Sequence, residues 1–466
     1  MSQRDRLYIR TLGCPKNEAD GAALIRYLEQ AGWVVVDDPD DADVEIVNTC
    51  GFVEAAKAES IGAIWEGVDR KHAAPNGRRR LLVTGCLAQR YAKELSAEVP
   101  ALDAIVGFDR PDLVARALDQ TANSGSAVCW VEKPGATYRE PAVGWSFDES
   151  HRAPLSAYIK IGDGCDNACR FCAIPLIRGR QRSRSAAAIT NEIRNLVSHG
   201  TREVVLVSQD TTSWGRDLEN GADLASLLRR IDSIPGEFWI RLMYAHPAFI
   251  TDPLIEAFGA CAGLVPYLDV PLQHASDRLL GIMNRGTTCA DTEAKLDRLR
   301  KVRPDIALRT TFLVGHPGET DDDFEELMRF AADNAFERMG VFTYSEEEGT
   351  PSARLEGKVP ENVASERAAR LAGLFDTWAA EQSIDKIGST IPCLLESRDA
   401  TGSWEGRSVH DAPEIDGRVV VTGGTIEGPG LYRMIVTDAH GVDLTGTLPT
   451  PIGSRAPGKS KVGCVL

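Results

Sequence analysis

Short runs of aliphatic and β-branched residues alternate with helical patterns in the first quarter of the chain. The apolar runs are LYIRTLG, WVVVDD, VEIVNT and RLLVTG, and helical patterns lie around 18–30 and 54–69. Strands that alternate with helices in this way are typical of a parallel sheet covered by helices. We therefore expect residues 1–120 to form an N-terminal α/β domain.

The alternation stops between residues 121 and 153, where Gly, Ser, Thr and Pro are frequent, and we expect a linker there. It resumes over 154–386, where six apolar runs are separated by amphipathic segments, which predicts a partial (βα)6 barrel. Such barrels carry their chemistry at the carboxyl ends of the strands. The six runs are AYIKIG, EVVLVSQD, FWIRLMYAH, YLDVPLQ, IALRTTFLVG and MGVFTYS.

Residues 387–450 contain short apolar runs with Gly-rich turns, which predict a small antiparallel β-barrel. Residues 451–466 are expected to be a disordered tail. The fold class is thus α/β and multidomain, with a parallel-sheet domain, a partial barrel and a small β-barrel in that order.

Composition limits the possible settings and partners. No apolar run approaches the ~18 residues of a membrane span, and no export signal is evident, so we expect a cytoplasmic protein without a membrane partner. The odd number of cysteines, 11, indicates thiols that are ligands or core residues in a reducing compartment. A net charge of −16 argues against a broad nucleic-acid surface and favours a basic partner.

The strongest chemical signal is the sequence KIGDGCDNACRFCAIP, in which Cys165, Cys169 and Cys172 are spaced C-x3-C-x2-C after a predicted strand. Closely spaced thiolates bind zinc or an iron-sulfur cluster. Structural zinc requires a fourth ligand, usually from a second pair, and the sequence has no such pair. Three thiolates on a 4Fe-4S cluster would leave one iron open to a small molecule.

Three further cysteines follow predicted strands in the N-terminal domain: Cys14, Cys50 and Cys86. The carboxyl ends of parallel strands form one edge, where ligands bind and helix N-termini stabilise thiolates. Spacing alone leaves two interpretations open, a shared metal site or three separate core thiols.

The C-x3-C-x2-C motif at the end of the first barrel strand resembles the radical S-adenosylmethionine superfamily, and Phe171 matches the aromatic position of its motif. The resemblance implies that the open iron binds S-adenosylmethionine and that electron transfer cleaves it to a radical. Phe171 and Gly315 are candidate cofactor contacts. His316 stands where an aromatic Phe is usual in this family.

The domain order resembles the methylthiotransferases of that superfamily, in which the last domain is called TRAM. This resemblance implies two 4Fe-4S clusters, one on Cys14, Cys50 and Cys86 and one on the later three cysteines. The stretches LGCPKN, SQDTT, DVPLQHAS and YSEEEGTP resemble the RimO branch, which modifies an aspartate of ribosomal protein S-twelve. The alternatives are a tRNA adenosine methylthiotransferase and an iron-sulfur electron carrier without turnover.

Charge points to the same branch. Nine acidic and four basic residues give 387–450 a formal charge of −5, which suits a basic ribosomal protein better than tRNA phosphates. The acidic SEEE at 345–348 is expected to receive that substrate, and the arginines of 178–184 to have a role in the site. No motif identifies the reductant, the sulfur donor or catalytic groups beyond the cluster ligands.

Overall fold

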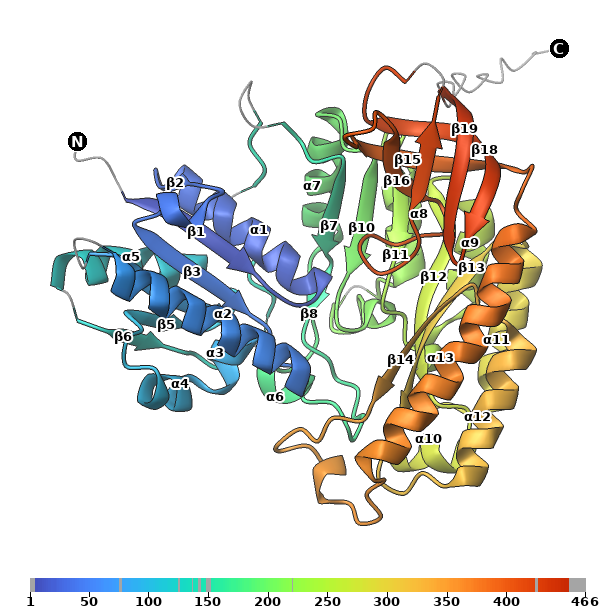
Figure 1. Cartoon of the computed structure of the whole chain (residues 1–466), viewed down its shortest axis with the longest axis horizontal. Coiled ribbons are helices and arrows are strands. Elements are labelled where there is room, and N and C mark those ends of the chain that lie inside the picture. The colour runs from blue at the N-terminus through green and yellow to red at the C-terminus, as the bar shows by residue number, and fades with distance from the viewer. Residues whose placement is uncertain are drawn as a thin grey trace.

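The computed structural model describes residues 5–74, 78–124, 126–135, 137–140, 144–147, 152–219, 221–423 and 426–451. An N-terminal α/β domain lies beside a central domain, and a C-terminal barrel caps one end of the central domain (Figure 1). Nearly all of the tail that was expected to be disordered, 452–466, lies outside the described residues.

The N-terminal sheet has six strands, and every neighbouring pair is parallel, as predicted. In spatial order the strands are β2 (Val34–Val35), β1 (Arg6–Thr11), β3 (Val44–Thr49), β4 (Arg80–Gly85), β5 (Ala104–Val106) and β6 (Val128–Trp130). Alternate residues of β3 pack into two different hydrophobic cores, because successive side chains of a strand point to opposite faces of the sheet. Val44 and Ile46 pack with α1 and α5, and Val47 packs with α2.

The helices of this domain cover both faces of the sheet. Helices α1 and α5 lie on one face, and α2, α3 and α4 lie on the other. Their bounds are α1 (Pro15–Gln30), α2 (Glu54–Ala73), α3 (Cys86–Arg90), α4 (Ala92–Glu98) and α5 (Pro111–Ser124), with a 3-10 turn η1 (Pro39–Asp41). Since α5 ends at Ser124 and β6 joins the sheet, the N-terminal fold extends into the range that was expected to be a linker.

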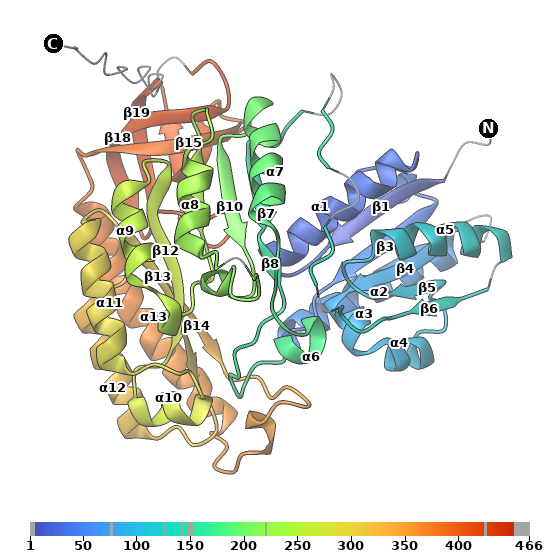
Figure 2. The same ribbon diagram turned by 180° about the vertical axis from the view of Figure 1, so that it is seen from behind.

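The central domain is an open sheet of six parallel strands, which confirms the predicted partial barrel. From edge to edge these are β14 (Arg338–Thr343), β13 (Ala307–Val314), β12 (Leu264–Gln273), β11 (Trp239–Leu242), β10 (Glu203–Val207) and β7 (Ser156–Lys160). The outer helices pack on its convex face (Figure 2). They are α7 (Ala186–Ser198), α8 (Leu224–Asp232), α9 (Asp252–Ala260), α11 (Cys289–Val302), α12 (Asp321–Asn334) and α13 (Glu361–Ile384).

Shorter elements stand in the connections of the central domain. Strands β8 (Gly162–Asp163) and β9 (Arg182–Ser183) pair in antiparallel fashion and flank helix α6 (Ile174–Arg178). The others are helix α10 (Asp277–Met283) and the turns η2 (Thr211–Ser213), η3 (Pro247–Phe249) and η4 (Ser352–Arg354).

The C-terminal strands form a small closed barrel, as predicted, although one pair, β17 with β19, is parallel. Around the barrel the strands are β15 (Thr390–Arg398), β16 (Trp404–Ser408), β17 (Val419–Thr422), β19 (Asp443–Pro451) and β18 (Gly430–His440). Leu394 and Val409 pack against Val205 and Tyr267 of the central sheet. The barrel therefore closes one end of the partial barrel rather than standing apart from it.

Buried ion pairs join these two domains. Glu203, whose side chain is fully buried, binds Arg241 of the same sheet at 2.8 Å and Arg407 of β16 at 2.6 Å. Asp411 pairs with Arg338, and Asp416 accepts a hydrogen bond from the Tyr267 hydroxyl. The −5 charge of 387–450 thus includes carboxylates that neutralise arginines of the central domain instead of facing a partner.

Glu203 is expected to make the joint between these domains sensitive to acid. Although burial raises the pKa of Glu203, Arg241 and Arg407 lower it from the usual 4.5 to about 2. The carboxylate therefore stabilises the folded chain above pH 4.5, and this contribution is lost as the pH falls toward 2.

We predict that Glu203→Gln lowers the midpoint of thermal unfolding at pH 7 by roughly 6–12 °C, because it leaves the buried guanidinium of Arg241 without a charged partner among the described residues and leaves Arg407 with Glu396 alone. Calorimetry of the variant and the wild type measures the shift. The matched control is Glu256→Gln, since Glu256 is exposed and lies 4.0 Å from Arg229. Equal midpoints for the two variants would contradict the role given to Glu203.

Candidate functional site

The three N-terminal cysteines lie at the carboxyl ends of three adjacent strands. Cys14 follows β1 and caps α1, Cys50 follows β3, and Cys86 follows β4 and begins α3. Burial raises the pKa of both Cys50 and Cys86, and negative charge at Cys14 raises it further, so the three thiols are within electrostatic range of one another. The fold brings the three together at one edge of the sheet.

Glycines make room for these thiols. Gly13 has φ +95°, and a Cβ there would stand 2.8 Å from the Cys50 sulfur. Gly85 has φ +96°, and a Cβ there would stand 2.4 Å from the Thr49 carbonyl oxygen. A side chain at either position would push apart the strand ends that carry the cysteines.

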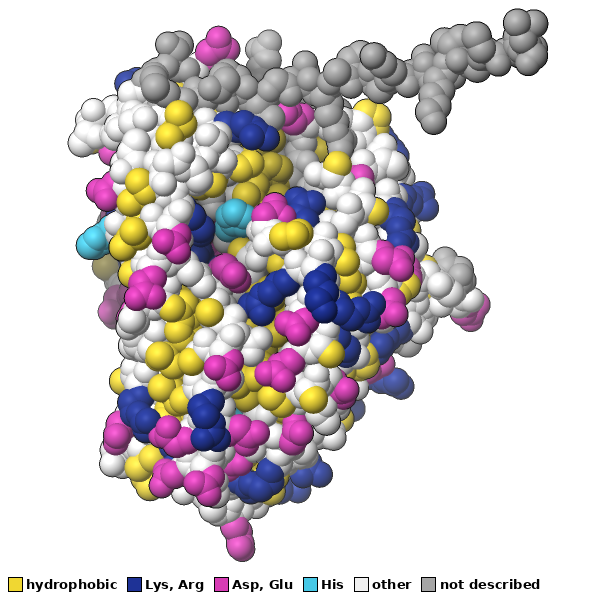
Figure 3. Space-filling model, turned by 90° about the vertical axis from the view of Figure 1, so that its right-hand side faces the viewer, with side chains coloured by type: hydrophobic (Ala, Val, Ile, Leu, Met, Phe, Trp, Pro, Cys, Tyr) yellow, Lys and Arg dark blue, Asp and Glu magenta, His cyan; other side chains and the backbone are white. Residues whose placement is uncertain are grey.

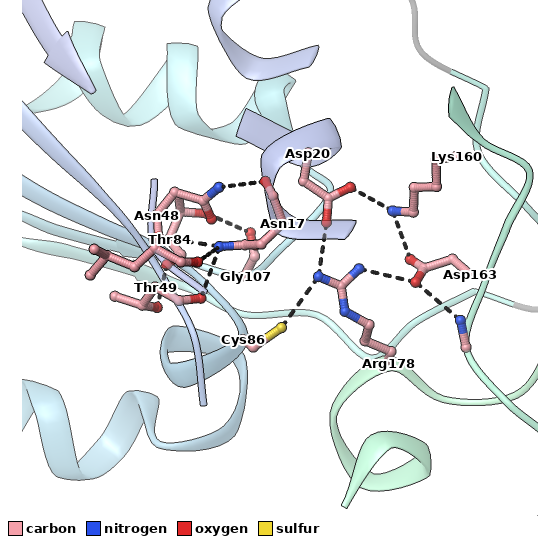
Figure 4. A network of polar contacts seen from close by, with 12 residues as sticks. Asn17, Asp20, Asn48, Thr49, Thr84, Cys86, Gly107, Lys160, Asp163 and Arg178 are labelled. Carbon is pink, nitrogen blue, oxygen red and sulfur yellow. Dashed lines mark hydrogen bonds and ion pairs between the residues drawn. The ribbon is translucent and has the colours of Figure 1, made fainter. Parts of the chain in front are cut away.

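Side-chain hydrogen bonds hold the same strand ends in register (Figure 4). The Asn17 amide of α1 donates to the carbonyls of Leu12 at 2.8 Å and Asn48 at 3.2 Å, and the Asn48 amide donates back to the Asn17 carbonyl. The Thr49 hydroxyl donates to the Thr84 carbonyl at 2.5 Å. The polar residues at the ends of LGCPKN and VEIVNT therefore fix the edge on which the cysteines stand.

The second set, Cys165, Cys169 and Cys172, lies on the loop between β8 and α6, beyond the carboxyl end of β7. The Asn167 backbone N–H donates to the Cys165 sulfur at 3.4 Å, and the Arg285 guanidinium donates to the Cys169 sulfur at 3.3 Å. Negative charge at Cys169 raises the pKa of both other thiols. Hydrogen-bond donors are thus directed at two of the three sulfurs of this loop.

The two sets are next to each other across a small apolar contact between domains. Cys86 of α3 packs with Ala173 and Ile177, and Ala173 is the residue after Cys172. Helix α6 lies beside α3 in both ribbon views (Figures 1 and 2). The contact therefore brings Cys86 against the residue that follows the last cysteine of the second set.

A buried ionic network surrounds this contact (Figure 4). Arg178 of α6 is within 2.9 Å of Asp20 and 3.0 Å of Asp163, and it donates to the Cys86 sulfur at 3.3 Å. Lys160 of β7 binds the same two carboxylates, at 2.6 Å and 3.1 Å. A guanidinium from the central domain therefore reaches a thiol of the N-terminal set.

Burial and charge set the proton affinity of the thiols. Burial raises the pKa of Cys50 to about 11 and that of Cys165 and Cys172 to about 12. Burial also raises the pKa of Cys14, but the positive charges of Lys16 and Arg178 bring it below its usual value.

The donor set fits two iron-sulfur clusters. Within the described ranges, no three His, Cys, Asp or Glu side chains converge on a single ion, which argues against a mononuclear zinc site. In a cluster each thiolate binds a different iron, so separated soft ligands are suitable. Arg178, Arg285 and Lys16 supply positive charge beside an anionic group, and sequence reasoning singled out neither Arg285 nor Lys16.

Phe171 and Gly315 lie near each other through His316. The Phe171 and His316 rings meet edge to face at 6.4 Å, and His316 donates from Nδ1 to the Pro317 carbonyl and accepts at Nε2 from the Ser352 hydroxyl at 2.8 Å. Burial lowers the pKa of His316 to about 4, so it is neutral. A Cβ on Gly315 would come within 2.5 Å of Ala364, so close packing against α13 already requires this glycine.

The SEEE segment is only partly open to a partner, because Glu346 and Glu348 are exposed but Glu347 between them is buried. Glu347 is 2% exposed and binds Arg90 at 2.6 Å and Lys57 at 3.2 Å, both from the N-terminal domain. The Ser345 hydroxyl accepts a hydrogen bond from the Glu54 backbone N–H. The segment is a second connection between the domains, in which Glu347 is engaged by the N-terminal domain, whereas Glu346 and Glu348 remain exposed.

Comparison with known proteins agrees with this architecture. Profiles of the uncharacterized protein family UPF0004, the radical SAM superfamily and the TRAM domain match residues 6–107, 159–331 and 387–448. Curated proteins named ribosomal protein uS12 methylthiotransferase RimO are similar over most of the chain. The protein from Pseudothermotoga lettingae is 41% identical over 95% of this chain and 100% of its own length, and that from Thermosipho africanus is 42% identical over 95% and 99%.

The chain belongs to the RimO family. This confirms the resemblance carried by LGCPKN, SQDTT, DVPLQHAS and YSEEEGTP. Among solved structures, the radical S-adenosylmethionine methyltransferase TsrM from Kitasatospora setae has a similar fold, with a TM-score of 0.53 and 14% identity over 80% of this chain and 89% of that one. None of the described helices is long and apolar enough to cross a membrane.

We predict that Cys14→Ala lowers the iron content of the reconstituted protein by about half, because one of two ligand sets is broken. Cleavage of S-adenosylmethionine, measured as 5'-deoxyadenosine, should remain, since the second set is intact. Cys129→Ala is the control, because Cys129 is exposed on β6. Full iron content in Cys14→Ala would contradict a shared site on the N-terminal edge.

Proposed function

We propose that this protein attaches a methylthio group to the β-carbon of an aspartate in ribosomal protein S-twelve. The observation that carries the proposal is the contact of Cys86 with Ala173, which sets two groups of three cysteines side by side in a chain 41% identical to RimO relatives. Because the proposed substrate is a ribosomal protein, the protein would act in the cytoplasm.

Cys165, Cys169 and Cys172 would hold one 4Fe-4S cluster, and Cys14, Cys50 and Cys86 would hold the other. When bound, the clusters and S-adenosylmethionine would supply a hydrogen-abstracting radical and a methylated sulfur. Arg178 and Arg285 hydrogen-bond one sulfur of each set and offset its negative charge. The Gln209 amide is buried, and neither its nitrogen nor its oxygen has a partner among the described residues, so it is suited to a polar cofactor group.

Radical chemistry needs a site from which water is excluded. The Glu347 pairs with Arg90 and Lys57 hold the 345–348 loop against the N-terminal domain, and the C-terminal barrel closes the other end of the central sheet. We infer that the three domains enclose the reacting atoms between the two cysteine sets.

Acidic residues near Cys14 support a basic protein substrate. Burial and the negative charge of Glu414 raise the pKa of Glu18 in α1. Glu414 is exposed on the loop between β16 and β17. In the described part of the chain neither carboxylate forms an ion pair, so both are available to cations of a partner. On the helical face of the central domain, by contrast, acidic and basic side chains are interspersed (Figure 3).

Deletion of the gene should remove the methylthio mass increment from S-twelve, as measured by mass spectrometry of the intact protein and its peptides. Complementation with the wild-type gene should restore the increment, and complementation with Cys165→Ala should not. Retention of the increment in the deletion strain would refute the proposal. Loss of a methylthio group from tRNA nucleosides instead would indicate a tRNA methylthiotransferase, and absence of 5'-deoxyadenosine formation would indicate an electron carrier.

Glu414→Lys should raise KM for S-twelve several-fold and weaken its dependence on salt, because charges at the rim of an interface act mainly on association. Glu427→Lys is the control, since Glu427 is also exposed on the C-terminal barrel. Steady-state kinetics at two ionic strengths measure both effects. An equal increase in KM for the two variants would show that only the net charge of the barrel matters.

A further inference from the structure

One cation beside the N-terminal cysteine set forms no ion pair with a carboxylate of the described residues. Lys16 lies in the first turn of α1, two residues after Cys14, and is half-buried. Its ammonium nitrogen stands 3.2 Å from the centroid of the Tyr244 ring. Among the described residues no carboxylate forms an ion pair with Lys16. Asp269, whose negative charge favours the protonated form of Lys16, binds Arg309 at 2.9 Å instead.

Other cations of the region are already engaged. Arg178 and Lys160 share Asp20 and Asp163, and Arg285 donates to the Pro271 carbonyl and the Cys169 sulfur. Lys16 differs because its ammonium group forms no hydrogen bond or ion pair with the described residues and contacts the face of the Tyr244 ring instead. An ammonium in such surroundings retains free donors that favour a carboxylate.

Lys16 connects the two domains at the edges where their strands end. It follows Cys14 in the first turn of α1, and its ammonium group lies on the ring of Tyr244, two residues after the end of β11 in the central sheet. Its positive charge also acts on Cys14 of the first cysteine set and on Cys172 of the second.

The backbone of Tyr244, whose ring contacts Lys16, has φ +61°. Two hydrogen bonds hold it there: the Tyr244 N–H donates to Asp269 at 3.0 Å, and the Tyr244 carbonyl accepts from the Thr211 N–H at 3.1 Å. Strained backbone of this kind is found where a side chain must be fixed for function.

We propose that Lys16 binds the side-chain carboxylate of the substrate aspartate and so positions its β-carbon between the two cysteine sets. The carboxylate carbon is bonded directly to the β-carbon, and a cation that holds the carboxylate therefore also fixes the carbon that loses hydrogen and gains sulfur. This role rests on the proposed function, and it makes Lys16 a determinant of specificity for aspartate over asparagine.

The test compares two peptides of S-twelve, one with the target aspartate and one with asparagine at that position, for binding to the holoenzyme. Wild type should bind the aspartate peptide roughly 10- to 100-fold more tightly, as expected for a charge-assisted hydrogen bond. Lys16→Met, which keeps the length of the side chain without its charge, should bind both peptides equally. Lys93→Met is the control, because Lys93 is exposed on α4.

Each outcome decides the proposal. Equal binding of the two peptides to wild type would overturn it without any variant, and so would a preference for aspartate that survives in Lys16→Met. A raised KM for S-adenosylmethionine with unchanged peptide binding would assign Lys16 to the cofactor's carboxylate instead. If wild type methylthiolates the aspartate peptide but binds the aspartate and asparagine peptides equally, only the role given to Lys16 is refuted. If wild type methylthiolates neither peptide, the proposed function is refuted.

Discussion

The arrangement of the two cysteine sets depends on the buried charges around Arg178. Asp20 comes from the N-terminal domain, whereas Lys160, Asp163 and Arg178 come from the central domain, and none of them can leave the network without stranding a charge away from water. Removal of one partner from such a network costs about 3–5 kcal/mol, although the intact network itself adds little stability. Its effect is to define one relative position of the two domains, and the hydrogen bond from Arg178 also fixes the position of Cys86, one of the predicted cluster ligands.

The same kind of contact recurs at the other junctions. Glu203 with Arg407 fixes the C-terminal barrel, and Glu347 with Arg90 fixes the loop that follows β14. Apolar contacts alone are not directional, so they tolerate sliding, whereas paired guanidinium and carboxylate groups have a preferred geometry. In this molecule the apolar cores stabilise each domain, and the ion pairs determine how the domains meet.

Much of the fold follows from local patterns in the sequence, because strands, helices and the three N-terminal cysteines obey the rule that parallel strands end at one edge. The spacing of Cys165, Cys169 and Cys172 is equally local. What could not be predicted depends on contacts between domains. Glu347 and Asp411 look like solvent-facing carboxylates in the sequence, and only the docked domains show that arginines far away in the chain bury them. The strand β6 of the N-terminal sheet was missed for a different reason, since three residues give no periodic signal.

Backbone strain is concentrated on the edge where the chemistry is proposed. Tyr244 follows β11 with φ +61°, and Gln273 ends the neighbouring β12 with φ +75°. Such conformations cost about 1–3 kcal/mol for residues with side chains and persist only where the surroundings enforce them. At Tyr244 these surroundings are Asp269 and Thr211, and Asp269 is itself held by Arg309, which also contacts Asp416 of the C-terminal barrel. The docked barrel therefore reaches the ring beneath Lys16 through a chain of three contacts, so that a domain remote from both cysteine sets helps to shape the space between them.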